Sequence, residues 1–377
     1  SMAMAYKVSK GEILRVSAAY GAMLERSGDT SKAKAVYDAY LAKSPDHPVI
    51  GQMAANLGKT KTAPKTPNEG LAEIYYAIAN SLSQDNAVDL SMFYAQISLA
   101  LNPRDDIAIT LLGERLQAAE RWDESSDVFR RIPKSSPVYQ NAQLQIGANL
   151  AKEDKLDEAV RVLTGALSGT ARDVAIHSTI GDAYREKERY AEADAAYTRA
   201  ANLLTKPSER DWILFYTRGI SRERLKRWTE AEADLEKALK LKPEQPLVMN
   251  YLAYTWIEHG VNQDKALDML HKAVDLREDD GYIVDSLGWA YYRRGEFAKA
   301  VKYLERAILL EPGEATINDH LGDAYWRVGR KNEAQFQWNH ALRLNPEAED
   351  KARIERKLSA GLDVVEAEER GKTKPAS

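Results

Sequence analysis

The chain has no cysteine among its 377 residues, which excludes disulfides, thiolate metal sites and cysteine nucleophiles. It also has no strong excess of charge, because 53 basic and 57 acidic side chains leave a net charge of −4. Nucleic-acid-binding domains are usually clearly basic, so we expect no nucleic-acid partner. No run of about 18 apolar residues occurs, so we expect no transmembrane segment. What remains is a chain with 44% hydrophobic residues, enough for an extended core.

The common catalytic motifs are missing as well. There is no phosphate-binding G-x-x-x-x-G-K-[ST] loop, no G-x-S-x-G elbow and no H-E-x-x-H pair. His320 and Asp323 are three apart on one helix and Asp319 is adjacent, and two interpretations are open: a metal ligand, or a buried and hydrogen-bonded side chain. The second interpretation is favoured, because His320 directly precedes Leu321 and Gly322, which are expected to lie on the packed side of their helix. We therefore expect no enzyme, no catalytic residues, no metal and no cofactor.

What the sequence does contain is a repeat with a period of 34 residues, written twice without a gap between Gly281 and Ala348. The landmarks Leu287, Gly288, Tyr291, Gly295, Ala300, Leu304, Ala307 and Pro312 recur 34 places later as Leu321, Gly322, Tyr325, Gly329, Ala334, Trp338, Ala341 and Pro346. A fixed period of this length is typical of stacked structural repeats.

Each repeat predicts two helices joined by a tight turn. Leu287 and Tyr291 share one side of the first helix, and Ala300 and Leu304 share one stripe of the second, because residues four apart lie on one helix face. Gly295 between them can adopt the left-handed conformation that ends a helix. Such a hairpin cannot bury its apolar side alone, so it must stack on its neighbours.

This spacing resembles the tetratricopeptide repeat, which implies an all-α, right-handed superhelical solenoid of helix-turn-helix units. Moving the pattern back along the chain gives about nine units in total. They span 14–47, 72–105, 106–139, 140–173, 174–207, 212–245, 246–280, 281–314 and 315–348.

The remaining residues form the two ends and two insertions. Residues 1–13 form an N-terminal segment, in which Ser1 before Met2 indicates a residue left by removal of a tag. The leading unit, 14–47, is followed at 48–71 by a short helix and a mobile, proline-bearing loop. The main solenoid of eight units covers 72–348. We expect a capping helix at 349–360 and a disordered tail at 361–377.

Arg218 and Arg222 occupy places in the sixth unit that usually carry Leu and Tyr. Two arginines on an inward stripe are costly unless they are paired. Either the helix is rotated, or both pair with acidic neighbours, or they present a cationic contact to a partner. The first two interpretations are favoured.

The resemblance also implies that the first helices line the concave side of the solenoid, and in the C-terminal units this side is rich in aromatic residues. A fold-only account predicts solvated polar residues there, whereas Tyr and Trp are typical interface anchors. The alternative is that Trp289 and Trp326 fill space between adjacent first helices. The candidate partner-binding residues are Tyr216, Asn250, Tyr254, Tyr282, Asp285, Trp289, Tyr292, Arg293, Asp319, Asp323, Trp326 and Arg327.

The block from Pro246 to Leu344, with PLVMNYLAYTWIEHG, GYIVDSLGWAYYRRGEFAKAVKYLERA and INDHLGDAYWRVGRKNEAQFQWNHAL, is similar to a bacterial group of exported repeat proteins. That group resembles the outer-membrane lipoprotein adaptor that bridges a carboxy-terminal processing protease to cell-wall hydrolase substrates. The resemblance implies a periplasmic location, with membrane anchoring by an N-terminal lipid signal removed from this chain. A cytoplasmic location stays open.

We therefore predict a non-catalytic scaffold or adaptor that binds a protein or peptide partner through the concave aromatic groove of the C-terminal repeats. The resemblance implies that this partner is a carboxy-terminal processing protease with its substrates. The alternative is a structural, self-assembling repeat protein with no peptide groove.

Overall fold

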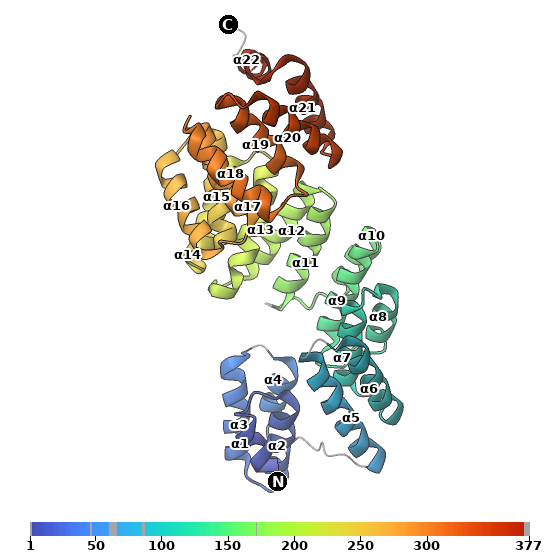
Figure 1. The fold of residues 1–377 in the computed structure, drawn as a ribbon. Helices are drawn as coiled ribbons and strands as arrows, with labels where there is room; N and C mark the ends of the chain where they lie inside the picture. Colours follow the sequence, from blue (N-terminus) through green and yellow to red (C-terminus); the bar gives the residue numbers. More distant parts are fainter. Residues whose placement is uncertain (1, 46, 60–65, 85–86, 171, 373–377) are drawn as a thin grey trace. The chain divides into compact units, whose positions relative to one another are not determined.

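The computed structural model describes residues 2–45, 47–59, 66–84, 87–170 and 172–372. These residues form helices joined by turns and loops, and no β-strand is found among them (Figure 1). The chain divides into two compact units, Ser1–Leu204 and Thr205–Ser377, called unit 1 and unit 2 below. The all-α repeat solenoid predicted from the 34-residue period is confirmed. None of the helices in the described ranges is both long enough and apolar enough to cross a bilayer.

Unit 1 is a series of helical hairpins. Its helices are α1 (Met2–Val8), α2 (Leu14–Arg26), α3 (Thr30–Lys43), α4 (Pro48–Ala55), α5 (Pro67–Gln84), α6 (Val88–Leu101), α7 (Asp106–Ala118), α8 (Trp122–Phe129), α9 (Tyr139–Lys152), α10 (Leu156–Gly165), α11 (Asp173–Glu186) and α12 (Tyr190–Leu203). From α5 onward each second helix packs against the first helix of the next hairpin. Helix α4 lies in the predicted insertion, whereas residues 60–65 of the predicted mobile loop lie outside the described residues.

Unit 2 continues the same arrangement. A 3₁₀ turn, η1 (Glu209–Asp211), precedes α13 (Trp212–Arg224), α14 (Trp228–Leu241), α15 (Pro246–His259), α16 (Gln263–Leu276), α17 (Gly281–Arg293), α18 (Phe297–Leu310), α19 (Ala315–Arg327), α20 (Lys331–Arg343), α21 (Ala348–Ala360) and α22 (Leu362–Lys372). Helix α21 packs on α20, at the place where the sequence predicted a cap.

The two helices of a hairpin cross where a glycine of the first meets a large side chain of the second. A Cβ atom at Gly322 would lie 2.5 Å from the Trp338 ring, and one at Gly113 would lie 2.5 Å from the Phe129 ring. Real carbon atoms do not approach this closely, so the landmark glycines are required by close packing. In the hairpin α5/α6 Ala79 replaces this glycine, and Ser91 and Ser98 replace the usual small apolar residues.

Both serines are fully buried and satisfied. Ser91 Oγ donates to the Ala79 carbonyl at 2.7 Å, and Ser98 Oγ donates to the Ala72 carbonyl at 2.9 Å. A buried hydroxyl without a partner is unfavourable, and the free carbonyl lone pairs of the first helix remove that penalty. The departures from the repeat pattern in this unit therefore do not disrupt the hairpin.

The turn inside the hairpins has one conformation throughout. The residue at the same place of eight units has φ between 57° and 86°, in the left-handed region; these residues are Gly28, Glu120, Asp154, Glu188, Lys226, Gly260, Gly295 and Gly329. The corresponding residue of the ninth unit, at position 86, is not described. A left-handed residue ends the first helix and frees the chain to reverse into the second.

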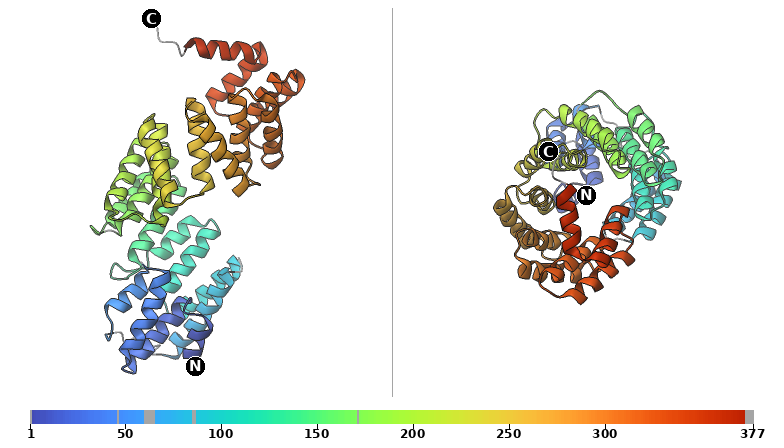
Figure 2. Two further views of the ribbon diagram at one scale, coloured as in Figure 1. Left: turned by 90° about the vertical axis from the view of Figure 1, so that its left-hand side faces the viewer. Right: turned by 90° about the horizontal axis from the view of Figure 1, so that it is seen from above.

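The end of the chain differs from the sequence prediction of a disordered tail from residue 361. Residues 362–372 form α22, and residues 373–377 lie outside the described range. Gly361, with φ of +85°, turns the chain between α21 and α22. The apolar side chains of Leu362 and Val365 are buried, which gives this segment a reason to fold that its acidic composition concealed. Figure 2 shows α22, in red beside the C-terminus, on the concave side of the row of unit 2 helices.

Candidate functional site on the first helices of unit 2

All twelve predicted site residues lie on α13, α15, α17 and α19, the first helices of the four hairpins of unit 2. The structure separates ten of them into three groups, a partly exposed row, a buried polar layer and a set that contacts α22, and leaves Tyr254 and Arg293 outside these groups. The first group is open to a partner. The other two are covered by residues of this same chain.

The open row begins with three apolar side chains at equivalent places of successive helices. Ile213 of α13 is 53% exposed, Leu247 of α15 is 41% exposed and Tyr282 of α17 is 50% exposed. Tyr282 donates a hydrogen bond of 2.6 Å to Glu314, which raises the pKa of its hydroxyl to about 12. Tyr216 and Asn250 lie one helical turn further along α13 and α15 and are half-buried. These five residues are called the open strip below.

The surroundings of Tyr216 and Asn250 in the open strip, and of the neighbouring Tyr254, bear on what could bind there. Tyr216 packs against Trp212, with ring centroids 5.9 Å apart, and edge-on against Tyr251. The side-chain oxygen of Asn250 is buried and accepts no hydrogen bond from the described residues. A buried acceptor without a donor costs free energy, so this carboxamide favours an additional hydrogen-bond donor at the strip. Tyr254, the next predicted residue on α15, is half-buried, and burial together with Glu258 and Asp285 raises its pKa.

The buried polar layer starts with stacked rings between α17 and α19. Trp289 is 6% exposed and is stacked on Tyr292, with centroids 4.6 Å apart, and on His320, with centroids 4.0 Å apart. His320 Nδ1 is 3.0 Å from Asp285 Oδ1, and both residues are buried. Burial opposes the charged imidazole, but the Asp285 carboxylate outweighs that effect and raises the pKa of His320. Trp289 therefore fills space between adjacent first helices, the alternative that the sequence left open.

Helix α21 completes this layer with a buried lysine. Lys357 Nζ donates to both Asp319 oxygens, at 2.8 and 2.7 Å, and to Asp323 at 2.8 Å. Asp323 also accepts a hydrogen bond of 2.9 Å from the Trp338 indole. Burial raises the pKa of Asp323 to about 6, against the opposing effect of Lys357. Asp285, Asp319 and Asp323 thus bind side chains of this chain in the described conformation.

The third group contacts α22. Trp326 Nε1 donates to Asp363 at 2.9 Å, and Arg327 donates to Asp363 at 2.7 Å and also pairs with Glu366. Tyr292 donates to Glu366 at 2.7 Å, and burial is the main cause that raises its pKa. Arg293, the last residue of α17, instead donates to Glu258 of α15 at 2.8 Å. Direct contact of a partner with Trp326, Arg327 or Tyr292 therefore stays a prediction that requires α22 to move.

Sequence reasoning missed the residues that cover the site, namely Lys357, Asp363 and Glu366. A signal was present: Leu362 and Val365 are three apart, and Asp363 and Glu366 are also three apart on the adjoining face. This is the pattern of a short amphipathic helix. Its partners across the fold could not be inferred from the sequence.

The inward arginines of α13 are paired, as one interpretation predicted. Arg218 makes two hydrogen bonds to Asp234 of α14, at 2.7 and 2.6 Å, and Arg222 donates to the same carboxylate at 2.8 Å. The Asp234 side chain is 5% exposed, and the arginine side chains are 11% and 13% exposed. The pairing favours a structural role for both arginines over a cationic contact surface.

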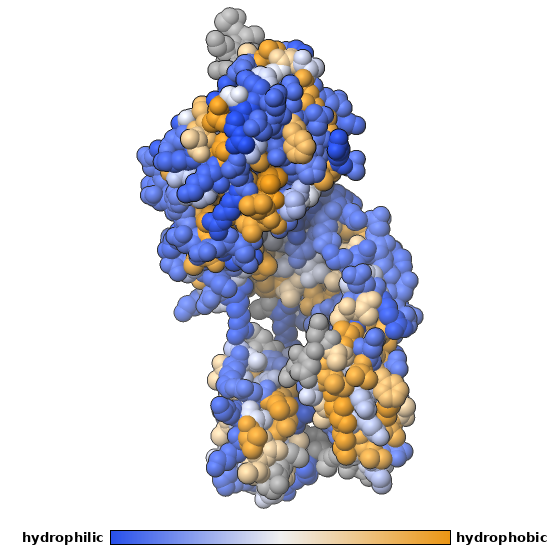
Figure 3. All heavy atoms as spheres, viewed as in Figure 1, coloured by the Kyte–Doolittle hydropathy of each residue, from blue (hydrophilic) through white to orange (hydrophobic). Residues whose placement is uncertain are grey.

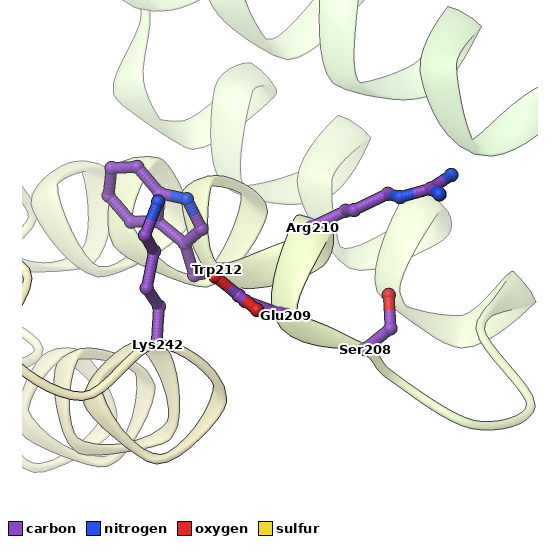
Figure 4. Close-up of a pocket in the computed structure, with 5 residues that line it drawn as sticks. All are labelled: Ser208, Glu209, Arg210, Trp212 and Lys242. Atoms are coloured by element: carbon purple, nitrogen blue, oxygen red, sulfur yellow. The ribbon is translucent and has the colours of Figure 1, made fainter. Parts of the chain in front are cut away.

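A pocket of about 380 Å³ lies where η1 enters α13, lined by Ser208, Glu209, Arg210, Trp212 and Lys242 (Figure 4). Lys242 Nζ is 5.6 Å from the centroid of the Trp212 ring. The pocket is open, and three of its five lining side chains, Glu209, Arg210 and Lys242, are charged, which is unlike the enclosed apolar sites that bind small molecules. Within the described ranges no group of three or more His, Cys, Asp or Glu residues could hold a metal ion.

Known proteins share the repeats and the fold of this chain. Tetratricopeptide repeat models match residues 174–203, 284–314 and 315–347. Among curated proteins the chain is similar to the TPR repeat-containing protein PA4667 of Pseudomonas aeruginosa, with 28% identity over 183 residues. That match covers 47% of this chain and 30% of the relative, so the chain spans less than a third of that protein's length.

Among solved structures the chain is similar to the APC/C hetero-tetramer Cut9-Hcn1, with a TM-score of 0.55 and 16% identity over 92% of this chain and 76% of that one. A tetratricopeptide repeat protein from Parabacteroides merdae gives a TM-score of 0.47 and 16% identity over 76% of this chain and 97% of that one. The fold is that of an all-α tetratricopeptide repeat solenoid, and tetratricopeptide repeat models match three of its repeats. Repeats of this class generally mediate protein–protein interaction.

Proposed function

We propose that this chain is a non-catalytic scaffold that holds a polypeptide partner on the open strip of unit 2. Stacked repeats bury the sides of their helices that face other repeats and leave one curved side for other molecules. In unit 2 that side carries the exposed side chains of Ile213, Leu247 and Tyr282, and apolar side chains gathered on one side often mark an interaction site. This row of exposed apolar residues is the observation that carries the proposal.

The strip suits a polypeptide more than a small molecule. It extends over the first helices of three successive hairpins, α13, α15 and α17, instead of closing around a cavity, and its apolar groups stand at one place in these three repeats. Tyr282 adds an aromatic anchor with a polar tip, and Asn250 adds an amide oxygen without a donor. Aromatic anchors beside unsatisfied amide groups are suited to an extended chain or helix that supplies both apolar side chains and N–H donors.

For the partner we propose a carboxy-terminal processing protease together with its cell-wall hydrolase substrates, acting in the periplasm. The block from Pro246 to Leu344, which resembles exported repeat adaptors, includes most of the open strip. In this proposal the chain contributes binding and proximity, and the protease carries out the catalysis. Membrane anchoring by an upstream lipid signal is part of the same proposal.

The test is direct binding of a purified carboxy-terminal processing protease from the same genome, measured by biolayer interferometry. We expect the wild-type chain to bind, and the variant Ile213→Asp/Leu247→Asp/Tyr282→Ala to bind at least tenfold more weakly with unchanged helical content. The control is Leu309→Asp/Phe336→Asp, two residues exposed by 82% and 67% on the second helices α18 and α20. Equal binding by the strip variant would reject the strip, and no binding by the wild type would reject the protease partner.

A second candidate function, self-assembly, is favoured by the hairpin α5/α6 of unit 1. Its residues Leu71, Ile74, Ile78, Leu90 and Phe93 are exposed by 37% to 56%. Figure 3 shows the apolar surface gathered over these two helices at the lower right. A patch of this kind on a protein surface usually marks a contact site.

Comparison between repeats explains why this face is open. The counterparts of Ile74 and Ile78 in the next three units, Ala108, Leu112, Ala142, Ile146, Ile176 and Ile180, are all at most 5% exposed. Those residues lie on α7, α9 and α11, each of which packs against the preceding hairpin. The face of α5 is therefore shaped to receive another helix, and a second copy of the chain can supply one by two-fold pairing of the same face.

Light scattering over a dilution series tests this second candidate. A dimer that dissociates on dilution, and that becomes monomeric in Ile74→Glu/Ile78→Glu, would support self-assembly. A wild-type chain that is monomeric at every concentration would reject it. Because these residues lie in unit 1, the result does not affect the test of the open strip.

A further inference from the structure

Helix α22 follows a stack that is already closed. Helix α21 packs on α20 and buries Ile354 and Lys357 against the last hairpin, which completes the solenoid. Gly361 then turns the chain, with a positive φ of 85°, so close to Trp326 that a Cβ atom would lie 2.8 Å from the indole ring. The chain therefore returns along the concave side of α19 and α17 instead of leaving the fold.

The contacts of α22 are those of an amphipathic helix on a binding surface. Leu362 has no exposed surface and Val365 has 4%, so both are buried against the rest of the chain, of which α21 packs on α22. Asp363 accepts hydrogen bonds from Trp326 and Arg327, and Glu366 accepts one from Tyr292 and pairs with Arg327. The two carboxylates are three residues apart and thus lie on one side of the helix.

The side chains that contact α22, namely Trp326, Arg327 and Tyr292, are called the receiving groups, and they favour carboxylate partners. Burial alone would lower the pKa of Arg327, but its hydrogen bonds to Glu366 and Tyr292 raise it, and the hydrogen bond from Trp326 lowers the pKa of Asp363. The guanidinium, the indole N–H and the phenol together present donors to two acidic side chains. The attachment remains peripheral, because Asp363 is 63% exposed and Val364 is 42% exposed.

We propose that α22 is an internal ligand of the concave surface and that a partner segment displaces it. This partner segment is an amphipathic helix that carries two carboxylates three residues apart, beside two apolar residues that are also three apart. Such a helix would take the place of Leu362, Asp363, Val365 and Glu366 on Trp326, Arg327 and Tyr292. This inference rests on the proposed scaffold function and adds to it a second contact, distinct from the open strip, that is closed in the free chain.

The test uses a fluorescent peptide with the sequence of residues 361–372, GLDVVEAEERGK, and the full chain. The variant Asp363→Lys/Glu366→Lys places two lysines opposite Arg327 and releases α22. We expect this variant to bind the peptide at least tenfold more tightly than the wild-type chain, because its own helix no longer competes. Hydrogen exchange should show faster exchange of the amides of residues 362–368 in the variant.

Two further variants make the test specific. Glu368 pairs with Arg356 of α21, away from the receiving groups, so Glu368→Lys should bind the peptide as weakly as the wild type. Arg327→Glu should lose binding of the natural peptide and gain binding of a peptide with both carboxylates changed to lysine. Recovery by reversed charges cannot arise from a general loss of folding.

Equal binding of the peptide to the wild-type chain and the Asp363→Lys/Glu366→Lys variant would overturn the inference, as would no binding to either chain. Unchanged exchange of residues 362–368 in the variant would also overturn it. The open-strip variant does not alter any residue that contacts α22. If the peptide-binding test fails and the open-strip variant weakens protease binding as expected, only the internal ligand is rejected. If the peptide-binding test succeeds and the open-strip variant binds the protease normally, only the proposed scaffold surface is rejected.

Discussion

Lys357 Nζ donates hydrogen bonds of 2.8 and 2.7 Å to Asp319, and the lysine side chain has no exposed surface. The same ammonium binds Asp323, so one cation from α21 satisfies two carboxylates of α19. Removing charged groups from water is expensive, and only close pairing of all members offsets that cost. The cap of the solenoid is therefore held by a buried ionic contact as well as by the apolar contact of Ile354.

Replacing this lysine should destabilise unit 2 strongly. Lys357→Met leaves Asp319 and Asp323 buried without their cation, and we expect the free energy of unfolding to fall by about 3–5 kcal/mol. Urea unfolding followed by circular dichroism measures the effect. Lys351→Met, on the exposed side of the same helix, should change little. Lys357→Met combined with Asp319→Asn and Asp323→Asn should recover most of the loss, and a loss below about 1 kcal/mol for the single variant would contradict a structural ionic contact.

The close crossing of α19 and α20 predicts a specific intolerance at Gly322. Gly322→Ala places a methyl group against the Trp338 ring, and we expect it to cost about 1–3 kcal/mol of unfolding free energy. Gly313 is the matched control, because a Cβ atom there has no neighbour within 4 Å. Thermal unfolding should therefore show a lower midpoint for Gly322→Ala and no decrease for Gly313→Ala. Equal effects would mean that backbone freedom, and not packing, explains both glycines.

Asp234 of α14 pairs with two arginines, so even a conservative substitution there should lower the free energy of unfolding strongly. Asp234→Asn keeps the shape of the side chain but removes the charge that pairs with Arg218 and Arg222, and we expect a loss of about 3 kcal/mol. Asp38→Asn removes one partner of the exposed pair with Lys34 and should cost less than about 1 kcal/mol. Chemical unfolding of both variants provides the comparison. Comparable losses would show that burial does not distinguish the two pairs.

The histidines predict pH effects of opposite sign. The pKa of His320 is raised in the folded chain because Asp285 outweighs burial, so its stabilisation is fully present below the unfolded pKa of roughly 6.5 and is lost as the pH rises through the folded value. The pKa of His177 in unit 1 is lowered, chiefly by burial, so its contribution is present above roughly pH 6.5 and is lost on acidification.

Urea unfolding between about pH 5 and 9 tests this contrast. We expect the difference in unfolding free energy between the wild type and His320→Gln to shrink as the pH rises, because the ionic contact with Asp285 is lost. For His177→Gln the contribution of the wild-type side chain should instead grow with pH. Parallel pH profiles for the two variants would show that Asp285 does not determine the protonation of His320.

Much of the fold could be predicted because the repeat is a local pattern. Gly322 and Trp338 are 16 positions apart in one hairpin, and their size complementarity is visible in the sequence without knowledge of any other unit. The pairing of Arg218 and Arg222 was one of three interpretations, and the sequence could not choose among them because Asp234 is one of several acidic residues within reach.

The candidate site was less predictable, because its state depends on contacts between distant segments. Trp326 and Asp363 are 37 positions apart, one in a repeat helix and the other in α22 beyond the last repeat, so periodicity within the repeats does not connect them. The acidic composition after Gly361 favoured a disordered tail, and the buried Leu362 and Val365 outweighed it. Which aromatic residues are exposed thus depended on two helices beyond the last repeat.

The left-handed turns give the chain an uneven distribution of conformational strain. From residue 106 to residue 245 the four hairpins carry Glu120, Asp154, Glu188 and Lys226 at this place, whereas the three hairpins from residue 246 to residue 348 carry glycine. A side chain in this conformation costs about 1 kcal/mol that glycine does not. Thermal fluctuations should therefore open the hairpins from residue 106 to residue 245, which include α13 of the open strip, before the three hairpins that follow, and glycine substitutions at those four turns offer a way to make the protein more heat-resistant without altering its binding surfaces.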